Sequence, residues 1–246
     1  MNDSLTGKKP APGLPANSES QRIIEAYNRR DQALPPGRYS SFEISHLLLQ
    51  QELERRILRV LGSRTHQNLA GRRILEVGCG SGRWLRQFIQ WGAAPEDLAG
   101  VDLLPDRIVQ AHKLCPAGVH LECGDASHLA FESQSFDIVF QAMAFTSILS
   151  GEVKGSVAQE MLRVLRKDGF VLWYDFFVNN PRNPDVRGVG KTELRELFPG
   201  CLIQCARVTL APPIGRLLGR FSESAYRFVS ALRFASTHFL AVIEKP

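Results

Sequence analysis

Residues 74–85 read Ile-Leu-Glu-Val-Gly-Cys-Gly-Ser-Gly-Arg-Trp-Leu, and this stretch decides the fold. A short apolar strand at 74–77 runs into glycines on alternate positions, and a helix is expected from Arg83 onward. Glycine is needed where the backbone takes a positive φ or passes close to a ligand. The N-terminus of the following helix offers free N–H groups to an anionic group. The stretch therefore predicts a strand, a ligand-binding turn and a helix.

An acidic residue follows the next expected strand. Residues 98–101 form that strand, and Asp102 comes after it, twenty positions beyond Gly82. In a doubly wound sheet this places a carboxylate beside the glycine turn, where it can accept both hydroxyls of a ribose. Arg83 stands where a dinucleotide fingerprint needs a glycine, which disfavours a nicotinamide cofactor. The spacing predicts nucleoside binding; the alternatives are an ordinary strand–helix turn and Asp102 as a helix cap.

From Arg72 onward, short apolar runs alternate with amphipathic stretches. We expect strands at 74–77, 98–101, 119–122, 136–140 and 170–174, with helices at 83–91, 105–114 and 152–166. Such alternation indicates an α/β fold, a parallel sheet covered by helices. Two more strands are expected at 202–210 and 238–243, separated by one amphipathic helix.

The chain divides into three expected parts. Residues 1–20 are rich in Pro, Ser, Ala and Gly and are expected to form a flexible tail. Helices expected at 21–34 and 43–61 would form an N-terminal cap over residues 21–70. One α/β domain is expected over residues 71–246, with a helical insertion at about 212–234.

Composition limits the protein class. The 246 residues are 44% hydrophobic and 22% charged, as in globular proteins. No run approaches the roughly 20 apolar residues of a membrane span, and no signal peptide is recognised, so we expect a cytoplasmic protein. The five cysteines lack zinc spacing, and no metal is expected. The net charge of +5 permits nucleic acid, anionic lipid or an acidic substrate as partner and selects none of them; it leaves the oligomeric state open.

The pattern Glu76-x-Gly78-x-Gly80-x-Gly82 resembles motif I of the class I S-adenosylmethionine-dependent methyltransferases. Further segments follow in that family's order: Gly-Val-Asp-Leu at 100–103, Cys-Gly-Asp-Ala at 123–126, Phe-Asp-Ile-Val-Phe at 136–140, and Glu160 through Gly169 before the fifth strand. The resemblance covers residues 72–174 and continues more loosely to 246. It implies a doubly wound, Rossmann-like sheet of seven strands, mostly parallel with an antiparallel last strand, and S-adenosylmethionine as the cofactor.

The resemblance also implies the cofactor contacts. Glu76, Gly78 and Gly80 would face the methionine part of the cofactor, Asp102 the ribose, and Asp125 and Ala126 the adenine, with Cys79, Gly82 and Leu103 completing the site and Gln141 near the methionine end. Asp125 has an alternative, since an aspartate before a short helix is commonly an N-cap. Asp137, at a strand start, is expected to be structural.

Acceptor-binding residues are sought beyond the fifth strand. Asp175 ends that strand and is the candidate general base, and the polar loop 179–187 after it offers Arg182 as an acceptor clamp. A surface loop could have the same composition by default. His238 precedes the last strand and is a second candidate, although a lone histidine is more often structural.

Residues of the N-terminal cap could also reach the site. Helices in this position commonly close over the cofactor in the resembled family, so Tyr27, Arg38 and Tyr39 are candidates for a lid that contacts substrate. Simple packing of an N-terminal helix is the alternative.

Residues 214–232 form an expected helix with one apolar stripe. The stripe comprises Ile214, Leu217, Leu218, Phe221, Ala225, Phe228, Val229 and Leu232, and the opposite face carries Arg216, Arg220 and Arg227. One interpretation is a helix that packs on the sheet and leaves its basic face in water. The other is a peripheral contact with a membrane surface or a lipid-linked substrate, because basic amphipathic helices bind anionic interfaces.

We therefore expect a methyltransferase that acts on a small molecule or a glycan, with an oxygen acceptor. Residues 173–189 and the pair Thr237-His238 resemble bacterial methyltransferases of cell-envelope polysaccharide or secondary-metabolite pathways. The alternatives are an RNA methyltransferase and a non-catalytic protein that binds S-adenosylmethionine. No RNA-binding module is recognised, so nucleic acid is the less expected partner.

Overall fold

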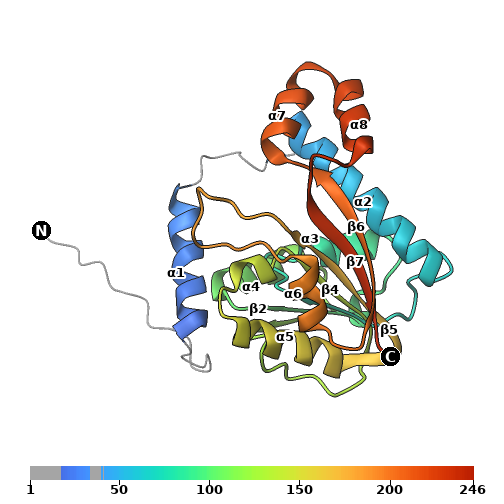
Figure 1. The fold of residues 1–246 in the computed structure, drawn as a ribbon. Helices are drawn as coiled ribbons and strands as arrows, with labels where there is room; N and C mark the ends of the chain where they lie inside the picture. The colour runs from blue at the N-terminus through green and yellow to red at the C-terminus, as the bar shows by residue number, and fades with distance from the viewer. Residues whose placement is uncertain (1–17, 34–39, 41) are drawn as a thin grey trace, which may run out of the picture.

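The computed structural model describes residues 18–33, 40 and 42–246, without the side chain of Arg220. It contains a seven-stranded sheet in the order β3-β2-β1-β4-β5-β7-β6. Strands β1 to β5 are parallel, and β7 is antiparallel to both of its neighbours, β5 and β6. The expected Rossmann-like fold is confirmed, with helices on both faces of the sheet (Figure 1).

The strands are β1 Ile74–Val77, β2 Leu98–Asp102, β3 His120–Cys123, β4 Phe136–Ala142, β5 Leu165–Phe176, β6 Leu202–Leu210 and β7 Ser236–Glu244. The helices are α1 Ser18–Ala33, α2 Ile44–Arg64, α3 Arg83–Gln90, α4 Pro105–Leu114, α5 Gly151–Val164, α6 Lys191–Leu197, α7 Pro212–Phe221 and α8 Glu223–Leu232, with short 3-10 helices η1 Pro95–Asp97 and η2 Phe145–Ser147.

The core lies on both faces of the central strands. Every residue of β1 is buried, as expected for a strand covered by helices on each side. On one face α5 and α6 pack on the sheet, for example through Met161 and Leu194. On the other face α2, α3 and α4 pack through residues such as Ile57, Phe88 and Ile108.

The junction of α5 and β5 differs from the expectation. The helix was expected to reach residue 166 and the strand to begin at 170, but α5 ends at Val164 and β5 begins at Leu165. Leu165 pairs with Phe136 in β4, and Arg166 donates to both carboxylate oxygens of Asp137 at 2.8 and 2.9 Å. These contacts with a neighbouring strand are not encoded locally. They also confirm Asp137 as a structural residue.

The N-terminal tail and the insertion require two corrections. Residues 18–20 of the expected tail belong to α1, because the Ser20 side chain is buried against Asp125, which lies far away in the sequence. The rest of the tail lies outside the described residues. The expected single helix at 214–232 is two helices. They are separated at Ser222, whose backbone is extended and whose side chain caps α8 by accepting from the backbone N–H of Ala225 at 3.1 Å.

The helical pair α7–α8 leaves the same sheet edge as the glycine turn. Strand β6 is antiparallel to β7, and β7 is antiparallel to β5, so β6 runs parallel to β5. The C-terminal ends of β1, β5 and β6 therefore lie at one edge, and α7 follows β6 directly. Figure 1 shows the pair projecting from the body of the sheet beside the start of α2. Within the described residues, no helix has the length and apolar character to cross a membrane.

Candidate functional site

The glycine turn after β1 is tied to the end of β2. The backbone N–H groups of Gly78 and Cys79 both donate to the carbonyl of Val101, at 2.8 and 3.1 Å. Gly82 takes φ 73° and stands at the N-cap position of α3, where no side chain caps the helix. The backbone N–H of Leu85, in the first turn of α3, bonds to the buried carboxyl of Glu76. The N-cap position itself offers no side-chain acceptor, so the start of α3 can receive a polar ligand group.

Two glycines of the turn differ in the space around them. A Cβ on Gly78 would lie 2.9 Å from the Cβ of Ala144, so this position is closed by the loop after β4. A Cβ on Gly80 would meet no atom within 4 Å. The open side of Gly80 is where a ligand can approach the backbone, and Gly78 instead allows the two loops to pack together.

Asp102 connects the end of β2 to the glycine turn. Its Oδ2 accepts from the N–H of Gly80 at 2.7 Å, and its Oδ1 accepts from the N–H of Leu104 at 2.9 Å. Burial raises the pKa of Asp102, and these two hydrogen bonds act against that rise. A carboxylate has about four lone-pair sites, so two remain for further donors such as ribose hydroxyls. The structure thus places Asp102 beside the turn, as the spacing predicted.

Glu76 is buried with an unsatisfied oxygen. Its Oε2 has no hydrogen-bond partner, and burial raises the pKa of the carboxyl well above its usual range, with the Asp102 carboxylate adding to the rise. The carboxyl does accept from the backbone N–H of Leu85, but a buried carboxylate oxygen without a partner is costly unless a cation or donor satisfies it. The ammonium and sulfonium groups of S-adenosylmethionine are cationic. The free oxygen of Glu76, the open side of Gly80 and the remaining acceptor sites of Asp102 therefore fit this cofactor.

Asp125 caps its own turn and also holds α1. Its Oδ1 accepts from the backbone and side chain of Ser127 at 2.9 and 2.7 Å, and its Oδ2 accepts from the hydroxyl of Ser20 at 2.8 Å. Burial acts to raise the pKa of Asp125, but these hydrogen bonds outweigh it and hold the pKa below its usual value. Asp125 therefore holds its own turn, but no helix follows it in the structure, so it is not a helix N-cap. Contact with adenine stays a prediction for Asp125 and the neighbouring Ala126.

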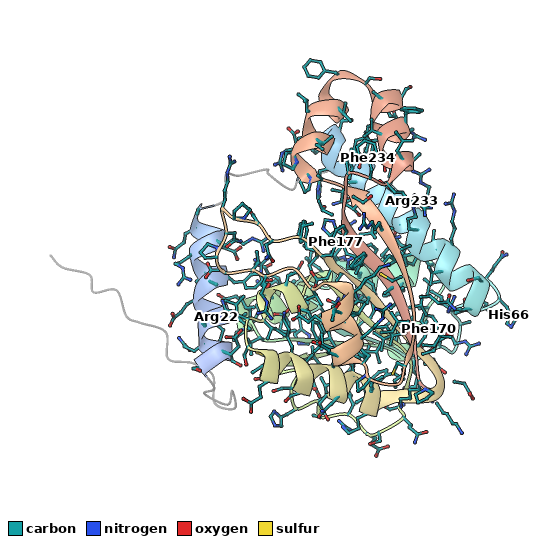
Figure 2. The ribbon with its side chains drawn as sticks, viewed as in Figure 1. Arg22, His66, Phe170, Phe177, Arg233 and Phe234 are labelled. Carbon is teal, nitrogen blue, oxygen red and sulfur yellow. The ribbon has the colours of Figure 1, made fainter. Side chains whose placement is uncertain are left out.

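Helix α1 is fixed across this edge by polar contacts. Tyr27 and Ser147 share a hydrogen bond at 3.0 Å between their hydroxyls, and Arg22 donates to the carbonyl of Ser147. Glu19 accepts from the backbone N–H groups of Leu149 and Ser150. Figure 2 shows Arg22 pointing from α1 toward the sheet. Tyr27 thus lies in a helix that is bonded to η2 and to the turn at Asp125, and its contact with substrate stays a prediction. Arg38 and Tyr39 lie outside the described residues.

The loop after β5 also contacts α1. Asp185 accepts from Arg29 at 3.1 Å, and the N–H of Arg187 donates to the carbonyl of Thr146 at 2.8 Å. The helix, η2 and this loop therefore form one connected layer, visible on the α1 side of Figure 1. Arg182 is exposed in the loop, and its role as an acceptor clamp stays a prediction.

Asp175 and His238 occupy buried positions. Asp175 accepts from the hydroxyl and N–H of Thr146 at 2.8 and 3.2 Å and from the N–H of Phe176, and burial raises its pKa to about 6. His238 stacks on Tyr174 with ring centroids 4.8 Å apart, and burial lowers its pKa to about 3. Neither contact pattern is specific to catalysis, so the base role of each stays a prediction.

Gln141 and Cys79 line the turn from behind. The side-chain oxygen of Gln141 accepts from the N–H of Ala144 at 3.0 Å, and its amide donates to the carbonyl of Tyr174. Gln141 thereby holds the loop that closes on Gly78. Burial raises the pKa of Cys79, which keeps its thiol protonated. Both residues, like Leu103, lie close to the turn in sequence or register, and their contact with cofactor stays a prediction.

Several residues of this layer had no sequence signal. Ser20, Thr146, Ser147 and Asp185 belong to no motif, and their partners lie 29 to 156 residues away. Only the packing of α1 and η2 brings them to the site. A separate hollow of about 480 Å³ lies near the start of β2 and β3, lined in part by Arg73, Glu96 and His120. It is at the opposite edge from the turn, whereas doubly wound sheets bind ligands at the carboxyl edge.

The sequence of this chain is similar to known methyltransferases. Residues 74–169 match the family described as methyltransferase domain. A phthiotriol/phenolphthiotriol dimycocerosates methyltransferase of Mycobacterium ulcerans is 33% identical over 127 residues, covering 47% of this chain and 42% of that protein. The Mycobacterium tuberculosis protein named for the same substrates is 28% identical over 188 residues, covering 72% of this chain and 64% of that protein.

A tRNA N(3)-cytidine methyltransferase of Gallus gallus is 30% identical over 115 residues, covering 44% of this chain and 31% of that protein. The chain thus spans less than two thirds of the length of these curated relatives.

Solved structures show the same fold. A protein from Pyrococcus horikoshii matches with a TM-score of 0.62 at 16% identity, over 89% of this chain and 99% of that chain. A SAM-dependent methyltransferase from Archaeoglobus fulgidus matches with a TM-score of 0.54 at 15% identity, over 81% of this chain and 98% of that chain. At these identities the likeness concerns the fold alone.

Proposed function

Because this chain belongs to the class I S-adenosylmethionine-dependent methyltransferases, we propose that it transfers a methyl group to an oxygen of a small-molecule, glycan or lipid-linked acceptor. The observation that carries the proposal is the buried, unpartnered oxygen of Glu76, next to the open side of Gly80 and to Asp102. Together they provide an acidic, partly open position for a cationic nucleoside at the carboxyl edge of the sheet.

Each residue of the turn has a proposed task. Glu76 would hold the cationic methionine end, Asp102 the ribose, and the turn at Asp125 the adenine. When bound, S-adenosylmethionine supplies an electrophilic methyl group on a sulfonium sulfur. The protein then contributes mainly by orienting the acceptor and excluding water, because a displacement at a sulfonium needs little acid catalysis.

A hydroxyl acceptor must also lose its proton. Asp175 is the proposed general base, and its pKa of about 6 would leave it largely ionised at neutral pH. Its hydrogen bonds to Thr146 support a different task, which is to position η2 under α1. His238 is the second proposed base, although its low pKa makes it a weak one.

The relatives support a lipid-linked acceptor within this class. Two of them are named for phthiotriol dimycocerosates, which are lipids, and the longer match extends over 72% of this chain. The match to a tRNA methyltransferase favours an RNA acceptor as a second candidate function. A peripheral membrane contact through residues 214–232 would bring a lipid-linked acceptor to the same sheet edge as the glycine turn.

The proposal is tested by incubating the purified chain with S-adenosylmethionine and separate acceptor pools of lipids, glycans and tRNA. We expect one pool to gain about 14 Da, the mass of CH₂, as S-adenosylhomocysteine accumulates in step with the methylated product. Cofactor binding with no methylated product in any pool would favour a non-catalytic binding protein. Absence of cofactor binding would contradict the proposal itself. A mass gain in the tRNA pool alone would show that the acceptor is RNA and not a lipid or glycan.

A further inference from the structure

The pair α7–α8 carries an apolar surface that faces solvent. Its members are Ile214, Leu217, Phe221, Phe228, Leu232 and Phe234, with exposed fractions from 39% to 80%; we call this set the hairpin face. The first of the two interpretations of this segment is therefore wrong, because most of its apolar stripe does not pack on the sheet. Exposed apolar residues scattered singly are normal on a protein surface, whereas six large ones within residues 214–234 are typical of an interaction site.

The helical pair α7–α8, which we call the hairpin, is not loosely packed. A Cβ on Gly219 of α7 would lie 2.9 Å from the Cα of Ser45 in α2, so the two helices are in close contact. Ser230 of α8 donates a hydrogen bond to the buried carboxylate of Glu52 in α2. Tyr226 is buried against α7 at Gly215. One side of each helix is therefore fixed on α2 or on the other helix, and the hairpin face is held outward.

The charge of the hairpin selects the kind of partner. Residues 212–234 contain four arginines, at 216, 220, 227 and 233, and one acidic residue, Glu223, so their formal net charge is +4 − 1 = +3. Arginines beside exposed phenylalanine and leucine are the composition that binds the headgroup region of an anionic bilayer. Figure 2 shows Arg233 and Phe234 adjacent where α8 returns to the sheet.

The position of the hairpin relates this surface to the site. The hairpin follows β6 at the sheet edge where β1 and β5 also end. A membrane bound to the hairpin face would therefore lie near the edge of the sheet that carries the glycine turn and the loop after β5. A lipid-linked acceptor could then reach the site without leaving the bilayer surface completely.

We propose that the hairpin face docks on the surface of an anionic lipid bilayer, with the phenylalanines at headgroup depth and the arginines near lipid phosphates. The inference deepens the lipid-linked acceptor of the proposed function, and its test does not involve methyl transfer. Each exposed phenylalanine should contribute about ten-fold to vesicle affinity through apolar burial. Each arginine should contribute about five-fold on an anionic surface.

The test is co-sedimentation of the full chain with vesicles of phosphatidylcholine plus phosphatidylglycerol, and with phosphatidylcholine alone. The variants are Phe221→Ser/Phe228→Ser and Arg216→Gln/Arg233→Gln. The matched control is Val109→Ser/Leu114→Ser, which removes two half-exposed apolar side chains from α4. We expect binding to anionic vesicles at low salt, a loss of about a hundred-fold in the phenylalanine variant and of about twenty-fold in the arginine variant, and no change in the control.

Three results would overturn the inference. One is no binding to anionic vesicles at low salt, and another is equal binding to vesicles of phosphatidylcholine alone. The third is a dimer, seen by light scattering, that the phenylalanine variant dissociates while vesicles bind neither protein; the hairpin face would then be an interface between two copies. If methylation of a soluble acceptor persists in any of these cases, the proposed function stands and the membrane contact alone fails.

Discussion

At the residue scale, the buried acids Glu76, Asp102 and Asp175 share one cause for their raised pKa values, which is burial at the carboxyl edge. They differ in their partners. Asp102 and Asp175 accept backbone hydrogen bonds, whereas one oxygen of Glu76 accepts none. In the protein without ligand this oxygen has no partner. A cationic ligand would supply one, so binding should stabilise Glu76 more than the other two acids.

Asp102→Ala should weaken binding of S-adenosylmethionine by about 2–3 kcal/mol, because two charge-assisted hydrogen bonds to the ribose are lost. Isothermal calorimetry measures the change, with Asp106→Ala in α4 as the control because Asp106 lies outside the proposed contacts. Thermal unfolding checks that the turn at Gly80 survives without its acceptor. Unchanged affinity in Asp102→Ala would remove this residue from the cofactor site.

At the element scale, α1 is held by hydrogen bonds to η2 and to the turn at Asp125 more than by a large apolar contact. Ile23 and Ala26 are its buried apolar residues in the described part of the helix. Elements with few buried apolar contacts open at low free-energy cost. We therefore expect α1 to open at low free-energy cost, with Tyr27 and Arg22 joining it to η2 in the closed state.

The hydrogen bond between Tyr27 and Ser147 should appear as a coupling energy of about 1 kcal/mol in a double-mutant cycle of Tyr27→Phe and Ser147→Ala. Hydrogen exchange of α1 amides measures the opening free energy of the helix. A parallel cycle that pairs Tyr27→Phe with Ser156→Ala in α5, whose hydroxyl donates to the carbonyl of Glu152, should give no coupling. Equal coupling in the two cycles would show that the bond does not hold α1.

The break between α7 and α8 depends on a cap. Ser222→Ala should destabilise α8 by about 1 kcal/mol, because the N–H of Ala225 loses its side-chain acceptor. Hydrogen exchange of α8 amides measures this loss of stability. Ser224→Ala, at an exposed position two residues after Ser222, should have little effect. If both variants weaken α8 equally, the cap does not set the start of this helix.

At the scale of the whole molecule, two buried groups give opposite dependences of stability on pH. His238 has a folded pKa of about 3 against 6.5 when exposed, so the native state binds fewer protons and stability is lost as the pH falls below 6.5. Asp175 has a folded pKa of about 6 against 3.8, so the native state binds more protons and stability falls as the pH rises from about 4 to 6.

Variants should separate these contributions. His238→Phe should lose less stability on acidification than the wild type, by up to about 5 kcal/mol between neutral pH and pH 3, from the two pKa values. In the wild type, Asp175 should lower the free energy of unfolding by up to about 3 kcal/mol as the pH rises from 4 to 6, and Asp175→Asn should abolish this decrease. Denaturant unfolding across pH measures both. A His238→Phe curve parallel to that of the wild type would mean that the buried imidazole is not kept neutral by the fold.

Much of the architecture could be predicted from local sequence because it depends on local chemistry. The bounds of β1, α4 and β6 agree with the predicted ranges, since hydrophobic periodicity and flanking glycines or prolines specify them directly. The α5–β5 junction was predicted less well, because Arg166 adopts strand geometry only through its pairing with Asp137 in another strand.

By itself, the sequence determined the strand–glycine–helix turn, the Asp102 beside it and the alternation of strands and helices, because each depends on neighbouring residues and on backbone chirality. Only the tertiary structure decided that Ser20 binds Asp125, that Thr146 binds Asp175 and that the stripe of α7–α8 faces solvent. These features join segments far apart in the chain. These contacts contribute to stability only after the helices have packed, so no local pattern in the sequence specifies which partner a residue binds or which face is exposed.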